Sequence, residues 1–93
     1  MATHYLACDL GAESGRVMLA TLNGGRIELE ELHRFPNGPV KTDGGLHWNI
    51  EALFTELKTG LKKAAARKLP IASISTDSWG VDYILYDAAG DMM

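Results

Sequence analysis

The sequence predicts an α/β domain in which three strands, one helix and two further strands follow one another. Two observations carry this prediction. Short apolar runs bounded by glycine, asparagine and proline occur in residues 4–35 and 71–87, and such runs are typical of strands. Between them, apolar residues recur at helical spacing from Ile50 to Ala65. We therefore expect the order β-β-β-α-β-β in one domain over residues 1–93.

The first three expected strands form an antiparallel meander. The runs HYLACDL (4–10) and GRVMLATL (15–22) are separated by DLGAESG (9–15), whose glycines and polar residues favour a hairpin turn. An Asn-Gly-Gly sequence (23–25) follows, and it predicts a tight turn because the central residues of such turns adopt positive φ. RIELEELHRF (26–35) then alternates polar and apolar residues like a third strand.

The helix is expected over about residues 50–68. Asn49 can cap its first turn, and Pro70 ends the pattern. Before it, PNGPVKTDGG (36–45) carries two prolines and three glycines and predicts a loop or an excursion of the chain, after which LHW (46–48) is compatible with a short strand. The basic residues near the end of the helix have a simple explanation, because cations are favourable at the negative end of the helix dipole.

The last two expected strands follow the helix. IASIST (71–76) is apolar on both faces, as a central strand would be, and DYILYD (82–87) is the final strand. They are separated by DSWGV (77–81). On its own this connection is explained by a turn that packs a tryptophan.

Composition and charge narrow the classes of function. Hydrophobic residues make up 46% and charged residues 23% of the chain, which is typical of a globular domain. The formal net charge is −3 and the basic residues are mostly scattered, so we expect no nucleic-acid partner. No apolar stretch approaches the ~18 residues that a membrane span needs, so we expect no membrane partner. The single cysteine, Cys8, lies in an expected strand, and a reducing cytoplasm is the expected location.

The turn DLGAESGR has the chemistry of a phosphate site. Gly11 and Gly15 allow backbone amides to approach an anion, Ser14 offers a hydroxyl, and Arg16 offers a planar cationic fork. Asp9 would place a carboxylate beside that phosphate, which is unfavourable unless a divalent cation such as Mg²⁺ lies between them. Aspartate and glycine are also common in plain turns, so this segment alone leaves both interpretations open.

Four segments, taken in this order, carry a resemblance to a known family: DLGAESGR (9–16), LHRFPNG (32–38), HWNIEALF (47–54) and DSWGVDYILYD (77–87). The chain resembles the N-terminal part of the FGGY family of carbohydrate kinases, and most closely the branch that phosphorylates L-rhamnulose. The resemblance covers essentially the whole chain. The SWGVD sequence is more specific than the glycine turn, because other branches carry different residues there.

This resemblance implies a fold and an activity. The fold would be the front half of a ribonuclease H-like, or actin-like ATPase, domain. In such kinases two domains close on ATP, Mg²⁺ and a ketose, and the γ-phosphoryl group passes to the 1-hydroxyl of the sugar. The catalytic aspartate and the second domain of the family lie far beyond residue 93, so no catalytic residue is assigned, and we expect the chain to be an inactive N-terminal fragment that lacks its C-terminal part.

The resemblance also implies individual site residues. Those expected at the ATP phosphates are Ala12, Glu13, Ser14, Gly15 and Arg16. Asp9 would bind Mg²⁺ through water, and the sugar pocket would include Gly80, with Trp79 and Asp82 as neighbours. Glu13 stands where relatives often carry a hydroxyl residue, so its side chain is expected to turn away or its backbone amide to act instead.

Two alternatives remain at this point. The first is a sister kinase that acts on fuculose, xylulose or glycerol, because one strand connection cannot determine the stereochemistry of the sugar. The second is a non-catalytic, actin-like nucleotide-binding module. The WGVD sequence (79–82) favours a sugar kinase, because such a module has no reason to carry polar and aromatic groups there.

Overall fold

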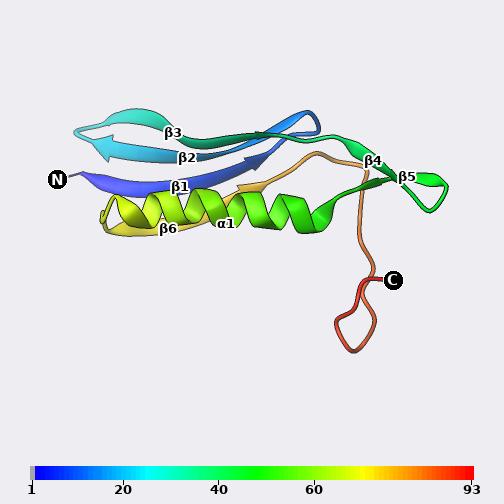
Figure 1. Cartoon of the computed structure of the whole chain (residues 1–93). Coiled ribbons are helices and arrows are strands. Elements are labelled where there is room, and N and C mark those ends of the chain that lie inside the picture. Colours follow the sequence, from blue (N-terminus) through cyan, green and yellow to red (C-terminus); the bar gives the residue numbers. More distant parts are fainter. Residues whose placement is uncertain (1) are drawn as a thin grey trace.

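The computed structural model describes residues 2–93. In chain order the elements are β1 (Thr3–Leu10), β2 (Ser14–Asn23), β3 (Arg26–Pro36), β4 (Pro39–Thr42), β5 (Gly45–Trp48), α1 (Ile50–Ala66) and β6 (Ile71–Asp77). Four strands form a mixed sheet in the order β3-β2-β1-β6, and β4 pairs with β5 in a separate hairpin. Helix α1 runs along the sheet (Figure 1). The predicted α/β fold class is confirmed.

The meander β1-β2-β3 has the predicted antiparallel pairing. The first hairpin pairs Asp9 with Arg16 and Leu10 with Gly15, so the strands meet directly at the glycine-containing turn. In the second turn Gly24 and Gly25 have φ values of 59° and 82°, which explains why glycine occupies both positions. The local sequence therefore determines both turns of the meander.

Helix α1 begins where the sequence predicts and ends two residues before the predicted end. The Asn49 side chain accepts a hydrogen bond of 3.0 Å from the backbone N–H of Ala52 and caps the first turn. At the other end Lys68 has a φ of 54°, which turns the backbone out of the helix before Pro70. Within residues 2–93 no helix is both long and apolar enough to cross a membrane.

The helix packs on one face of the sheet. Leu6, Cys8, Val17, Leu19 and Phe35 are buried. Val17 approaches helix α1 at Gly60. The other face, which carries half-buried Tyr5, Ala7, Met18 and Ala20, has no helix over it in the part of the chain that the structure describes. We call this second surface the open sheet face.

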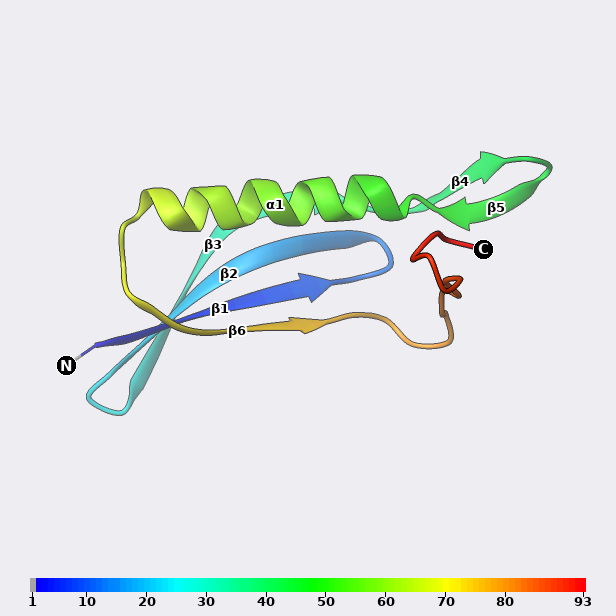
Figure 2. The same ribbon diagram turned by 90° about the horizontal axis from the view of Figure 1, so that it is seen from below.

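Strand β6 pairs in parallel with β1, and α1 forms the crossover that a parallel pair requires (Figure 2). The prediction that IASIST is a central strand is not met in residues 2–93. Here β6 is an edge strand, because β1 is its one neighbour in the sheet. Ile74 in this strand is consequently 54% exposed, whereas Ile71 is half-buried and packs against the core.

The prediction of a final strand over 82–87 is wrong. After Asp77 the chain leaves the sheet and makes one isolated antiparallel bridge, between Tyr86 and Met92. A strand needs the hydrogen bonds of a neighbouring strand, and this segment lies past the C-terminal end of β6, where no strand of the sheet runs beside it (Figure 2). Its side chains are exposed, with 84% exposure at Tyr83.

Of the two predictions for residues 36–45, a loop or an excursion of the chain, the structure shows the excursion: the segment contributes β4, which pairs with β5 from Pro39–Trp48 to Thr42–Gly45. Its turn is formed by Asp43 and Gly44, both with positive φ. The short strand suggested by LHW is confirmed as part of β5. The hairpin projects beyond the first turn of α1 (Figure 1).

Candidate functional site

The candidate site lies where β1 and β6 end. The β1–β2 turn, the β4–β5 hairpin, the first turn of α1 and the chain after β6 gather at this end of the molecule (Figure 2). In open α/β sheets, ligands bind beyond the carboxyl ends of the strands. Both groups of residues predicted from the sequence, the turn residues and the WGVD residues, are found here.

Asn37 holds the β1–β2 turn in place. Its backbone N–H donates to the Glu13 carbonyl at 2.9 Å, and its side-chain amide donates to the Gly11 carbonyl at 3.0 Å. The Gly11 N–H donates to the Ser14 carbonyl at 2.9 Å. The N–H groups of Ala12 and Glu13 take no part in these bonds within residues 2–93, and both residues are exposed at the tip. The turn thus has two backbone donors at its exposed tip that these bonds leave unused.

Arg16 lies directly opposite Asp9 in the hairpin and binds it. Its Nη1 donates to Oδ2 of Asp9, while Nη2 donates to the carbonyl and the hydroxyl of Ser14 at 3.1 and 2.9 Å. The Arg16 side chain is 23% exposed and the Asp9 side chain 50% exposed. The structure therefore brings together three of the residues predicted at the phosphate and metal sites.

The two glycines of the turn have reasons of packing as well. A Cβ at Gly15 would lie 2.3 Å from Cζ of Phe35, whose ring is buried against it. A Cβ at Gly11 would lie 2.6 Å from the Ser14 carbonyl oxygen. Contacts this short require the backbone or the ring to move, so the fold itself excludes side chains at both positions.

Asp77 is an acidic neighbour that the sequence analysis did not assign to the site. It is the register partner of Asp9 in the parallel β1–β6 pair, so the two carboxylates stand at the ends of adjacent strands. One oxygen of Asp77 accepts from the Ser78 N–H at 2.9 Å. Residues 2–93 hold no group of three or more ligating side chains. Asp9 and Asp77 supply two carboxylates, which is within the one or two that Mg²⁺ commonly takes beside phosphate oxygens and water.

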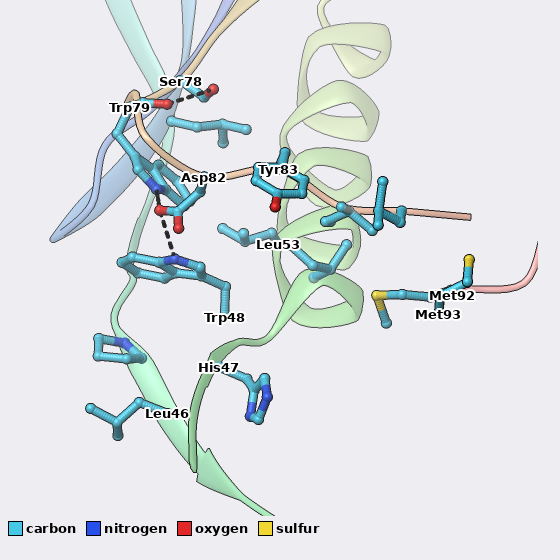
Figure 3. Close-up of a pocket in the computed structure, with 15 residues that line it drawn as sticks. Leu46, His47, Trp48, Leu53, Ser78, Trp79, Asp82, Tyr83, Met92 and Met93 are labelled. Carbon is cyan, nitrogen blue, oxygen red and sulfur yellow. Dashed lines mark hydrogen bonds between the residues drawn. The ribbon is translucent and has the colours of Figure 1, made fainter. Parts of the chain in front are cut away.

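A groove of about 710 Å³ lies at the same end of the molecule (Figure 3). Leu10 and Ser78, which directly follow Asp9 and Asp77, are among its lining residues. Its walls come from β5, the start of α1, the chain after β6 and the C-terminal residues. Leu53, Trp48, Trp79 and Asp82 are among the lining residues. A mostly apolar groove with a few directed polar groups is typical of a small-molecule site.

Two indole rings converge on one carboxylate in this groove. Nε1 of Trp48 and Nε1 of Trp79 both donate to Oδ2 of Asp82, at 3.0 and 2.6 Å. The ring centroids are 4.5 Å apart and the planes make an angle of 47°. Figure 3 shows both rings directed toward the carboxylate. Trp79 and Asp82 were expected here, whereas Trp48 was not, although an aromatic residue just before a helix cap was visible in the sequence.

Gly80 adjoins the groove without lining it. A Cβ at this position would have no atom within 4 Å. Within residues 2–93 no packing contact therefore explains a glycine here, in contrast to Gly15. The fold therefore needs a glycine at position 15, whereas the surroundings of Gly80 are open.

Comparison with known proteins adds a family context. No family model matches the chain. The chain is 39% identical over 89 residues to the rhamnulokinase of Bacillus subtilis and 42% identical over 93 residues to that of Bacteroides thetaiotaomicron. It is 46% identical over 89 residues to a rhamnulokinase of Klebsiella pneumoniae.

These alignments take in 94–100% of the chain and 18–19% of each relative. The chain therefore spans about a fifth of the length of the rhamnulokinases that it matches. The resemblance that the four sequence segments predict is confirmed: over 94–100% of its length, this chain is similar to rhamnulokinases.

Proposed function

We propose that the chain is part of an ATP-dependent sugar kinase, in which it binds the ATP phosphates at the β1–β2 turn and a ketose in the groove. The observation that carries the proposal is the identity of 39–46% to rhamnulokinases along the whole chain. The substrate would be L-rhamnulose, which receives the γ-phosphoryl group of ATP on its 1-hydroxyl. The product is L-rhamnulose 1-phosphate.

The turn would bind phosphate through several donors of different kinds. The backbone N–H groups of Ala12 and Glu13 at the exposed tip can donate to phosphate oxygens, as can the Ser14 hydroxyl. Because Gly15 has no side chain, the backbone at the end of the turn packs directly against the ring of Phe35. Arg16 supplies the positive charge, and its bonds to Ser14 hold the guanidinium toward the turn. Phosphoryl transfer depends mainly on this kind of positioning and charge stabilisation.

Mg²⁺ would be held by Asp9, with Asp77 beside it in register. Two neighbouring carboxylates repel one another, and Arg16 compensates one of them by its ion pair with Asp9. A divalent cation bound here would neutralise charge on the transferring phosphoryl group. The side chains of Asp9 and Asp77 would hold it.

The general base that accepts the proton of the sugar hydroxyl is proposed to lie in the part of a rhamnulokinase that this chain does not cover. The groove supplies Asp82 and two aromatic rings for binding the sugar, which is a positioning role. The location of the whole protein is proposed to be the cytoplasm, in keeping with a free, buried Cys8.

The proposal predicts a difference between the chain alone and a graft. In the graft, residues 1–93 replace the matching segment of the Bacteroides thetaiotaomicron rhamnulokinase. We expect the graft to release ADP in a manner that depends on L-rhamnulose, and the chain alone to show no turnover, because loss of a positioned base alone costs about 10²–10⁴ in rate. A coupled assay for ADP with ATP and Mg²⁺ in excess measures both.

Parallel assays with fuculose, xylulose and glycerol compare the sister kinases. A faster reaction with one of these three compounds would make that compound the proposed substrate in place of L-rhamnulose. A folded graft that binds ATP and phosphorylates none of the four would contradict the proposal and favour a nucleotide-binding module. Ketose-dependent turnover by the chain alone would move the base into residues 1–93, with Asp77 and Asp82 as the candidates.

Gly80 offers a second test in the graft. Gly80→Ala is expected to raise the KM for the sugar by about tenfold and to leave the KM for ATP within about twofold, since a methyl group beside a bound sugar takes the space of the ligand. The folding of the graft should not change, because the added Cβ meets no atom of this chain within 4 Å. Steady-state kinetics with each substrate varied in turn give the two constants. Equal changes in both would show that Gly80 is an ordinary turn residue.

A further inference from the structure

We propose that Trp48 is a positioning residue of the sugar site, which holds the Asp82 carboxylate so that its second oxygen accepts hydroxyl groups of the ketose. This inference rests on the proposed function. It assigns a role in substrate binding to the β4–β5 hairpin, which brings Trp48 to the groove.

Asp82 needs such support because its own segment gives it little. Its neighbours Val81 and Tyr83 are 102% and 84% exposed, and this segment belongs to no strand. The Asp82 carboxylate is held instead by the indole N–H of Trp79, three residues away, and that of Trp48, 34 residues away. The bond from Trp48 therefore ties an exposed segment to a distant part of the fold.

Trp48 itself is fixed from two directions. It is the last residue of β5 and pairs with Pro39 in the hairpin. It also directly precedes Asn49, whose side chain caps α1. A residue held by both a strand pair and a helix cap is well suited to orient a partner, because few backbone rotations can move it.

The geometry leaves a binding surface free. Both indole bonds go to Oδ2 of Asp82, so within residues 2–93 neither uses Oδ1, which can accept hydrogen bonds from a ligand. The two rings meet at 47° with centroids 4.5 Å apart and form a V-shaped wall. A ketose carries hydroxyl groups for the carboxylate and C–H groups for the aromatic faces. The pair of tryptophans with Asp82 thus matches both kinds of surface on a sugar.

The contact can be tested in the 93-residue chain without a sugar. Trp48 and Trp79 are its two tryptophans, so Trp79→Phe leaves Trp48 as the sole indole fluorophore. In that background Asp82→Ala is expected to shift the Trp48 emission, because the indole N–H loses its charged acceptor. Asp91→Ala is the matched control, since it removes an exposed carboxylate of the same terminal segment. An emission that responds equally to both changes, or to neither, overturns the proposal.

The role in binding is tested in the graft. Trp48→Phe keeps an aromatic ring and loses the N–H, and it is expected to raise the KM for L-rhamnulose by about tenfold, as for loss of a hydrogen bond to a charged group. The kcat and the KM for ATP should stay within about twofold. Val40→Ala, in the same hairpin but outside the groove lining, should leave all three constants unchanged. Asp82→Asn should raise the sugar KM, and adding Trp48→Phe to it should raise the KM by less than the product of the two separate effects.

The outcomes separate the two proposals. If the unaltered graft is active and Trp48→Phe leaves the KM for the sugar unchanged, the proposed role of Trp48 is overturned and the kinase proposal still stands. Equal losses for the sugar and for ATP would indicate a merely structural role and would also overturn it. A folded graft with no ketose-dependent turnover contradicts the proposed function itself, and the role in sugar binding fails with it even if the fluorescence contact is found.

Discussion

Replacing Gly60 with alanine is expected to lower the free energy of unfolding of the chain by about 2 kcal/mol. The added Cβ would lie 2.3 Å from Cγ2 and 2.8 Å from Cβ of Val17, whose side chain is fully buried between helix and sheet. Alanine is the better helix former by about 1 kcal/mol, so the expected loss is what remains after that gain. Urea denaturation followed by circular dichroism measures the change.

Gly80→Ala is the matched control for this experiment, because its Cβ has no atom within 4 Å. Its unfolding midpoint should stay within the error of that of the unaltered chain. If Gly60→Ala instead raised the midpoint, α1 would have to sit farther from Val17 than the structure places it. The close approach of helix and sheet at this glycine would then be wrong.

The second large effect is expected at Arg16. Arg16→Ala in the graft should lower kcat/KM for ATP by about 30-fold or more, which corresponds to the ~2 kcal/mol typical of losing a charged transition-state contact. The residue is suited to this role because its guanidinium already binds Asp9 and Ser14 beside the turn. Steady-state kinetics with ATP varied at saturating sugar give the value.

Arg16→Lys provides the control, since lysine keeps the charge but cannot reproduce the planar fork of donors. It should recover only part of the activity. Thermal unfolding of both variants separates catalysis from stability, because loss of the partly exposed Asp9 pair is expected to cost no more than about 1 kcal/mol. Unchanged kinetics for ATP in Arg16→Ala would contradict the phosphate role of the turn.

The parts of the fold that could be predicted are those that local sequence determines. The Asn-Gly-Gly turn, the capping by Asn49 and the helical spacing all act within a few residues, and each was predicted correctly. The wrong predictions concern segments whose structure depends on pairing with another strand. An apolar run becomes a strand only when a neighbour supplies hydrogen bonds, so residues 82–87 have strand composition without forming a strand. The edge position of β6 likewise depends on which strands are present.

In the candidate site, too, contacts between residues close in sequence could be predicted, whereas contacts between distant residues could not. Asp9, Ser14 and Arg16 are close in sequence, and the structure brings them together as their spacing suggests. Asn37 and Trp48 reach the site across separations of 26 and 34 residues. No local pattern reports contacts at such distances, because they depend on how the hairpin and the strand ends meet in space.

The exposed segment after β6, the projecting β4–β5 hairpin and the free edge of β6 make this chain large for its mass. A compact monomer of 10.1 kDa would expose about 5,300 Å² by surface scaling, whereas this chain exposes 6830 Å². Its radius of gyration is 15.7 Å, against about 12 Å for a compact domain of its length. The surplus area is roughly twice the ~800 Å² that one partner contributes to a standard protein interface. In area the chain is equivalent to a compact protein of about 14 kDa, so its mass alone understates how much of it meets solvent.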